Sequence, residues 1–166
     1  MGTEIERKFL LANDSWRSMV SERLLFRQAY IHFRENSNGI VRIRIAGDQG
    51  FLTLKGPVSG CSRKEYEYEI PLEDANRMID DFCERPFIEK FRSIVRNGAD
   101  CWEIDEFLGD NQGLTVAEIE LESEDAPFDR PLWLGEEVTG KPEYYNSSLA
   151  RNPYKNWTEH KTQPNE

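Results

Sequence analysis

The chain has 166 residues, which predicts a single domain, and 31 Asp and Glu against 21 Lys and Arg give a formal charge of −10. This acidic balance argues against duplex nucleic acid or an anionic membrane as a partner. Only 38% of the residues are hydrophobic, but nine Phe, six Tyr and four Trp argue against a disordered chain.

Targeting signals and cysteines point to one compartment. No apolar run approaches the length of a membrane span, and no apolar leader follows Met1. Cys61, Cys83 and Cys101 have neither a CxxC spacing nor a zinc-ligand spacing. We therefore expect a cytoplasmic protein with reduced thiols and no membrane partner.

Most of the chain is predicted to form strands, and the short turns between them favour antiparallel neighbours. The predicted strands cover, in chain order, 3–12, 25–34, 39–46, 51–56, 63–70, 87–96, 101–108 and 114–123.

Helices interrupt this series. A helix over 14–22 is expected from a cap at Asp14 or Ser15. A second, over 73–84, carries apolar residues at i, i+3, i+4 and i+7. A short third helix is expected near 146–151. We expect one domain over 1–155 and a polar, loose tail over 156–166.

Charged side chains share one face of nearly every predicted strand, because residues two apart in a strand point the same way. Three strands are basic on this face, with Arg42 and Arg44, with Lys55, and with Lys90 and Arg92. Three are acidic, with Glu65, Glu67 and Glu69 beside Arg63, with Glu103 and Asp105, and with Glu118, Glu120 and Glu122. The first strand mixes both signs, with Glu4, Glu6 and Lys8.

An antiparallel sheet with one solvated face is the simplest explanation of such alternation. Three features favour a closed barrel with a charged lumen instead. The polar face is almost entirely charged, and like charges recur two residues apart, which is unfavourable unless opposite charges face them. Whole strands are also segregated by the sign of their charge. In a barrel of this kind the apolar faces point outward, and the helices cover part of them.

The basic and the acidic side chains suit the two components of a metal–phosphate complex. Lys and Arg side chains bind phosphate oxygens through charge-assisted hydrogen bonds. Glu and Asp oxygens are ligands that Mg²⁺ or Mn²⁺ prefers. Together they predict a site for a metal and a polyphosphate.

Short motifs follow the same strands. Glu4-Ile5-Glu6-Arg7-Lys8 is similar to an amino-terminal ExExK signature. Six further segments follow it: Arg42-Ile43-Arg44, Leu52-Thr53-Leu54-Lys55-Gly56, Ser62-Arg63-Lys64-Glu65-Tyr66-Glu67, Lys90-Phe91-Arg92, Glu103-Ile104-Asp105 and Ala117-Glu118-Ile119-Glu120-Leu121. In this order they resemble the triphosphate tunnel metalloenzymes, the family built on the CYTH domain, over about residues 3–151.

The resemblance implies a mainly β fold, a closed eight-stranded antiparallel β-barrel tunnel with a few flanking helices. It implies metal ligands at Glu4, Glu6, Glu118 and Glu120, with Asp105 holding a metal or its water. It implies a triphosphate clamp of Lys8, Arg42, Arg44, Lys55, Lys90 and Arg92, which Arg63 can join.

The implied reaction is hydrolysis of the terminal phosphoanhydride of a triphosphate with Mg²⁺ or Mn²⁺, with Lys8 and Asp105 as catalytic candidates. The short chain resembles members that favour inorganic tripolyphosphate. The same tunnel also suits a class IV adenylyl cyclase, a thiamine triphosphatase or a nucleoside triphosphatase. From a different class, a module that binds polyphosphate or a nucleotide without turnover stays open.

Some placements are left open by the sequence. Tyr30 either faces the site or packs in the wall, and Lys141 and Lys155 either reach the tunnel or are solvated. An exposed apolar barrel wall would favour a homodimer.

Overall fold

The computed structural model describes residues 2–31 and 39–157. Its strands are β1 (Gly2–Leu11), β2 (Val20–Ile31), β3 (Ile40–Ala46), β4 (Gln49–Lys55), β5 (Ser62–Ile70), β6 (Ile88–Asn97), β7 (Asp100–Phe107), β8 (Thr115–Glu120) and β9 (Leu134–Glu137). The α-helices are α1 (Leu72–Phe82) and α2 (Asn146–Arg151). Short 3-10 helices are η1 (Ser15–Met19), η2 (Gly109–Asn111), η3 (Pro142–Tyr144) and η4 (Tyr154–Asn156).

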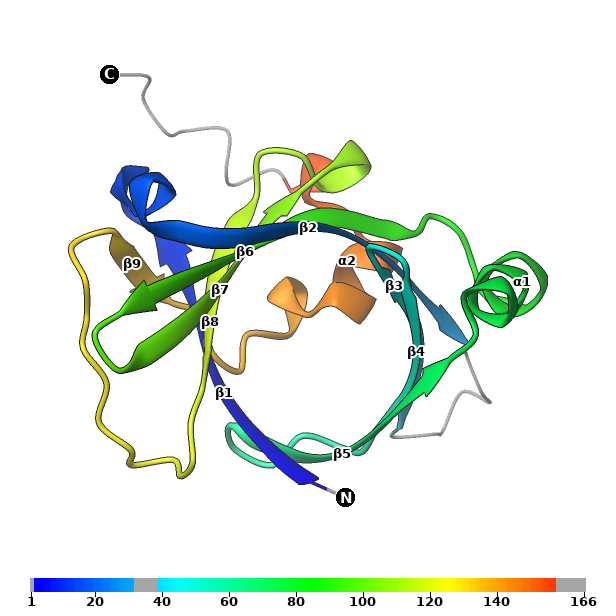
Figure 1. The fold of residues 1–166 in the computed structure, drawn as a ribbon, viewed down its shortest axis with the longest axis horizontal. Helices are drawn as coiled ribbons and strands as arrows, with labels where there is room; N and C mark the ends of the chain where they lie inside the picture. Colours follow the sequence, from blue (N-terminus) through cyan, green and yellow to red (C-terminus); the bar gives the residue numbers. More distant parts are fainter. Residues whose placement is uncertain (1, 32–38, 158–166) are drawn as a thin grey trace.

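Eight antiparallel strands close into a barrel in the order β5-β4-β3-β2-β6-β7-β8-β1, as Figure 1 shows. Strand β1 closes it, because residues 2–5 pair with β5 and residues 6–10 pair with β8. The expected eight-stranded barrel is therefore confirmed. Short β9 adds to the β1 edge, where Phe9 lies opposite Glu137, and the sequence analysis did not predict it.

The prediction of a helix over 14–22 is wrong. Only the 3-10 helix η1 forms, and Asp14 makes no side-chain cap hydrogen bond. Strand β2 begins at Val20, which pairs with Val95 of β6, so strand pairing outweighs the local helical pattern. Strand β8 ends at Glu120, shorter than expected. The last residues of the strand expected over 25–34, and residues 158–166 of the expected tail, lie outside the described residues.

Helix α1 confirms the second expected helix and covers the outside of the barrel. Ala75 and Ile79 pack against Ile43 and Ala29, and all four are buried. A Cβ on Gly50 would lie 2.8 Å from the Cβ of Ala75, so glycine permits the close approach of α1 to β4.

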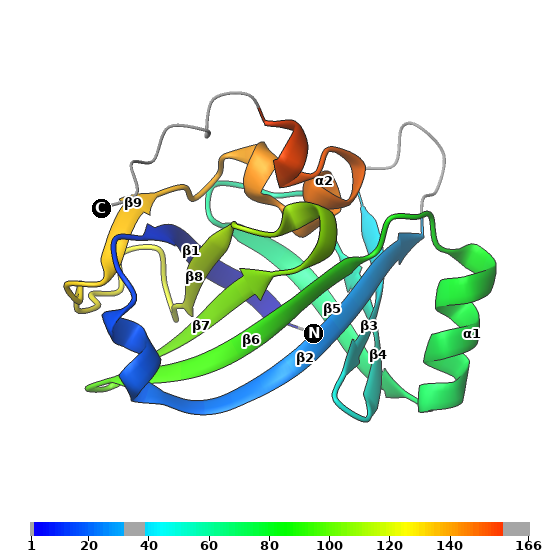
Figure 2. The same ribbon diagram turned by 90° about the horizontal axis from the view of Figure 1, so that it is seen from above.

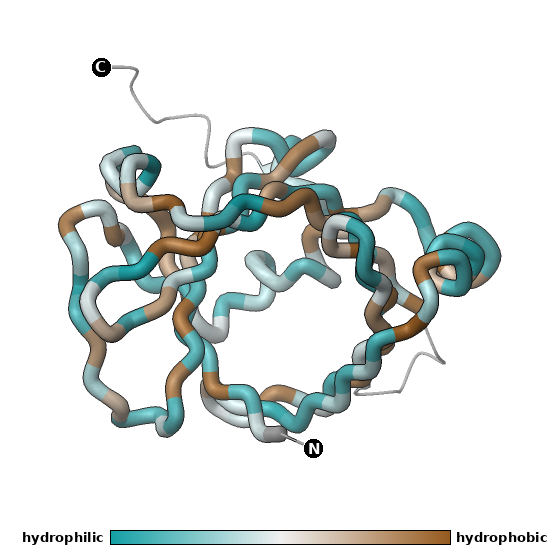
Figure 3. The backbone as a smooth tube through the Cα atoms, in the orientation of Figure 1, coloured by the Kyte–Doolittle hydropathy of each residue, from teal (hydrophilic) through white to brown (hydrophobic). Residues whose placement is uncertain are grey.

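A second apolar cluster also lies outside the barrel. It consists of Phe9, Trp16, Val95, Trp102, Ile104, Ala117, Ile119 and Trp133. The segment that precedes β9 covers it, and Figure 3 shows apolar and polar positions alternating around the ring. Packing on the outer faces leaves the inner faces free for charged side chains.

Helix α2 lies across one end of the barrel, as Figure 2 shows. Its Leu149 is buried in a cluster with Tyr144 of η3 and with Ile88 and Phe107 of the wall. Trp157 packs edge-to-face on Tyr144 and Tyr154, with ring centroids 5.1 and 5.2 Å apart. Among the described residues, no helix is long and apolar enough to cross a membrane.

Candidate active site in the barrel lumen

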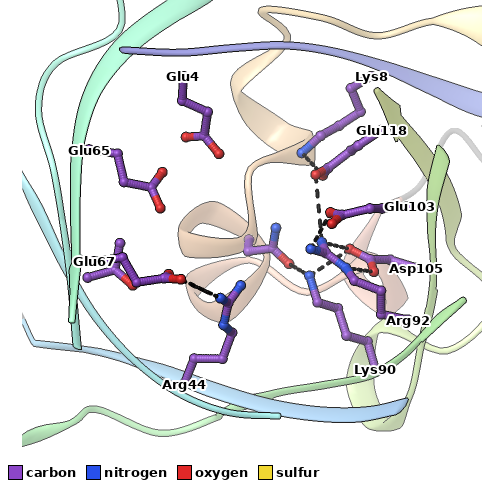
Figure 4. Close-up of polar contacts among 12 residues, drawn as sticks. Glu4, Lys8, Arg44, Glu65, Glu67, Lys90, Arg92, Glu103, Asp105 and Glu118 are labelled. Atoms are coloured by element: carbon purple, nitrogen blue, oxygen red, sulfur yellow. Dashed lines mark hydrogen bonds and ion pairs between the residues drawn. The ribbon is translucent and has the colours of Figure 1, made fainter. Parts of the chain in front are cut away.

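The lumen is a cavity of about 750 Å³. Every site residue expected from the sequence lines it, except Asp105. The expected residues that line it are Glu4, Glu6, Lys8, Arg42, Arg44, Lys55, Arg63, Lys90, Arg92, Glu118 and Glu120. The alternation of each strand places these side chains on one face, and closure of the barrel brings the faces together (Figure 4).

The cations of the lumen are buried and held by carboxylates. Lys8 and Lys90 are only 5% and 1% exposed. Lys8 Nζ lies 2.9 Å from Glu118 Oε1. Lys55 Nζ lies 2.9 Å from Glu4 Oε2 and 2.8 Å from Glu65 Oε2. A buried charge is tolerated only when it is paired, so these carboxylates stabilise the lysines in the lumen.

Asp105 lies behind the cations instead of in the cavity. It is fully buried. Its carboxylate accepts hydrogen bonds from Lys90 Nζ at 2.6 Å and from Arg92 Nε and Nη2 at 2.7 and 2.8 Å. Burial would raise the pKa of Asp105, but Arg92 and Lys90 outweigh it and hold the pKa below its usual value. The position fits a residue that orients the two cations.

The glutamates of β1 and β8 form the acidic wall. Glu6 lies opposite Glu120 in the register of the two strands, and Lys8 lies opposite Glu118. Burial and the Glu118 carboxylate raise the pKa of Glu6 to about 7. Burial would raise the pKa of Glu118 as well, but Lys8, Arg92 and Lys90 lower it far below its usual value.

This wall suits a divalent cation by its chemistry. Within residues 2–31 and 39–157, no group of three or more His, Cys, Asp or Glu is already arranged around a metal position. Several carboxylates are turned toward lysines and arginines instead, as the pairs of Glu4 with Lys55 and Glu118 with Lys8 show. The donors are all carboxylate oxygens, the type that Mg²⁺ and Mn²⁺ prefer, and a dication would offset the repulsion between Glu6 and Glu118.

Glu65 and Glu67 of β5 lie in the lumen, and the sequence analysis placed both on the charged face without expecting either in the site. Glu67 Oε2 accepts hydrogen bonds from Arg42 Nη2 at 3.1 Å, Arg44 Nη2 at 3.0 Å and Thr53 Oγ1 at 2.9 Å. Glu65 pairs with Lys55. Because both glutamates alternate with apolar residues on the charged face of their strand, that pattern could have predicted them as site residues.

The closed end of the lumen holds residues that no strand pattern indicated. Tyr145, Asn146 and Ser147 line the cavity. Lys90 Nζ donates to Asn146 Oδ1 at 3.2 Å, and Lys8 Nζ donates to the Tyr144 carbonyl at 3.4 Å. These contacts depend on where η3 and α2 dock, which local periodicity does not specify.

The structure decides whether Tyr30, Lys141 and Lys155, which the sequence left open, lie in the lumen. Tyr30 lines the cavity, and its hydroxyl accepts a hydrogen bond from Gln28 Nε2 at 2.7 Å. Lys141 pairs on the surface with Glu136 at 2.6 Å, and Lys155 pairs with Asp110 at 2.9 Å. Neither lysine is part of the lumen lining.

Comparison with known proteins agrees with this geometry. The family model described as the CYTH domain matches residues 2–154. The chain belongs to the CYTH family. This CYTH chain is 50% identical over 159 residues to the inorganic triphosphatase of Acetivibrio thermocellus, covering 96% of this chain and 100% of that protein.

A second relative and a solved structure point the same way. The CYTH chain is 38% identical over 151 residues to the inorganic triphosphatase of Nitrosomonas europaea, covering 89% of this chain and 97% of that one. The crystal structure of the inorganic triphosphatase NE1496 superposes with a TM-score of 0.64 at 34% identity, covering 90% and 95% of the two chains.

Proposed function

We propose that this CYTH chain hydrolyses inorganic triphosphate to pyrophosphate and phosphate inside the barrel, with Mg²⁺ or Mn²⁺. The observation that carries the proposal is the ring of buried cations that faces a row of glutamates across one cavity. The relatives named inorganic triphosphatases, which the chain matches over nearly its whole length, support the choice of substrate.

The basic wall would bind the triphosphate. Arg42, Arg44, Lys55 and Arg63 come from the neighbouring strands β3, β4 and β5, and Lys90 and Arg92 come from β6. The carboxylates that now pair with several of these cations hold them in place. Phosphate oxygens would replace part of these ion pairs, with bidentate contacts from the guanidinium groups.

The acidic wall would hold the metal, through Glu4, Glu6, Glu118 and Glu120. When bound, a divalent metal neutralises charge on the terminal phosphate and activates water. Lys8 is an ammonium paired with Glu118, so it can donate to a phosphate oxygen or hold a water at the acidic wall. Asp105, which we infer acts indirectly, holds Lys90 and Arg92 in position.

Phosphate release measured with tripolyphosphate, ATP, GTP and thiamine triphosphate, each with Mg²⁺ and with Mn²⁺, tests the proposal. Fastest release from tripolyphosphate, stopped by EDTA, is the expected result. Faster release from a nucleotide or from thiamine triphosphate would overturn the substrate, and cyclic AMP from ATP would indicate a cyclase. Binding without release of phosphate would indicate a binding module.

Two further expectations are proposals of the same kind. The three cysteines are free thiols, which supports a cytoplasmic location.

The outer faces of β4 and β5 expose apolar side chains, with Leu54 41% and Tyr68 57% exposed, which supports a homodimer.

A further inference from the structure

The lumen face of β2 carries no Lys or Arg, although β2 lies between two basic strands. Its neighbours are β3, with Arg42 and Arg44, and β6, with Lys90 and Arg92. At the middle of β2, Phe26 points toward the lumen, and it is 7% exposed. It is not part of the cavity lining, because the cations lie over it.

Three cations gather on this one ring. The guanidinium carbons of Arg92 and Arg44 lie 5.0 and 5.2 Å from the ring centroid of Phe26, and Lys90 Nζ lies 6.0 Å from it. Lys90 is the direct cross-strand partner of Phe26, and the two arginines are diagonal neighbours. These distances lie within the range over which the negative face of an aromatic ring attracts a cation.

The cations need such support because they repel one another. Burial, together with the charges of Arg42 and Arg92, lowers the pKa of Arg44 to about 10. Carboxylates offset part of this repulsion, but each carboxylate also competes with phosphate for the guanidinium group. An aromatic ring attracts the cations and leaves their outward N–H groups free.

We propose that Phe26 is a positioning residue for triphosphate binding: its ring holds Arg44 and Arg92 apart and directed into the cavity. The inference rests on the proposed function, because it assigns a role in binding the same substrate. The ring does not contact the substrate, so its effect reaches the reaction only through the cations.

Replacing Phe26 with phenylalanines that carry one, two or three ring fluorines tests the proposal, because fluorine weakens the negative ring face with little change in volume. Tripolyphosphate affinity is measured by calorimetry without metal. We expect a graded loss that reaches about tenfold, equivalent to about 1.4 kcal/mol, for the trifluoro ring. Phe26→Leu should weaken binding to a similar extent and raise KM more than it lowers kcat.

Phe91 provides a matched control on the same pair of strands. It points to the outside of the barrel, where the guanidinium carbon of Arg23 lies 3.7 Å from its ring centroid. The same fluorinated residues at Phe91 should leave the affinity for tripolyphosphate unchanged. Thermal unfolding of both series shows whether the barrel keeps its stability.

The outcomes separate the two proposals. No graded loss at Phe26, or an equal loss at Phe91, overturns the role of the ring and leaves the proposed function in place. Wild-type protein that binds tripolyphosphate without hydrolysing it overturns the proposed function, while the affinity series still decides the role of Phe26. Wild-type protein that does not bind tripolyphosphate overturns both.

Discussion

The two faces of the barrel wall bury their side chains for opposite reasons. Lys8 and Phe9 are consecutive residues of β1, and they are 5% and 0% exposed. Phe9 packs outward among Trp102 and Phe128, whereas Lys8 points inward and pairs with Glu118. Burial alone therefore does not separate a packing residue from a functional one; the face of the strand and the chemistry around it do.

Phe9→Ala is expected to have the largest effect, because it opens a cavity in the outer cluster. The ring makes edge-to-face contacts with Trp102 at 5.8 Å and Phe128 at 5.9 Å between centroids. The free energy of unfolding should fall by about 3–5 kcal/mol. Denaturant unfolding measures it, and a loss below about 1 kcal/mol would contradict the outer-core assignment.

Lys8→Ala should lower activity and leave the fold intact, the opposite of the effect expected for Phe9→Ala. We expect hydrolysis of tripolyphosphate to fall by about 100-fold or more, because an ammonium directed at the reacting phosphate is lost. Circular dichroism should show an intact barrel, because Glu118 keeps Arg92 as a partner at 3.7 Å. Turnover equal to that of the wild type would remove Lys8 from the site.

Asp105→Asn distinguishes a metal ligand from a residue that orients cations. Since Asp105 lies behind Lys90 and Arg92, we expect KM for tripolyphosphate to rise about tenfold. The Mn²⁺ concentration that gives half-maximal activity should change little. A larger shift in that Mn²⁺ concentration than in KM would instead make Asp105 a metal ligand.

Glu137→Gln tests an ion pair on the outer face of the barrel. There, Arg7 of β1 donates to both carboxylate oxygens of Glu137 at 2.8 and 2.6 Å. The loss in unfolding free energy at pH 7 should be about 1 kcal/mol, since the pair is partly exposed. Hydrogen bonding to Arg7 lowers the pKa of Glu137. Its contribution is therefore complete above the usual glutamate pKa of about 4.5 and is lost as the pH falls through the lower folded-state value.

The control for Glu137→Gln is Glu136→Gln. Glu136 pairs with Lys141 at the surface, with both side chains well exposed. Its replacement should leave the unfolding free energy nearly unchanged. Chemical denaturation of both variants at pH 7 and pH 3 measures the difference, and a gap between wild type and Glu137→Gln that does not narrow between pH 7 and pH 3 would contradict the ion pair as its cause.

The sequence alone determined which side chains share a face. A strand has a period of two, so residues such as Arg42 and Arg44 had to point the same way wherever the strand was placed. The segregation of charge by strand then favoured a closed barrel, and the ordered motifs identified the family. These conclusions needed only local geometry and the order of the segments.

Tertiary structure decided what lies at each depth and at each end of the lumen. Glu103 and Asp105 share a face, yet Asp105 is fully buried against both Lys90 and Arg92, whereas Glu103 lines the cavity and pairs with Arg92 alone, because register and barrel closure set that depth. The segment over 14–22 became a short turn and the start of β2, because pairing with β6 outweighed the local helical pattern. Asn146 reached Lys90 through the docking of α2, a contact between residues 56 positions apart in the chain, which no periodicity in the sequence records.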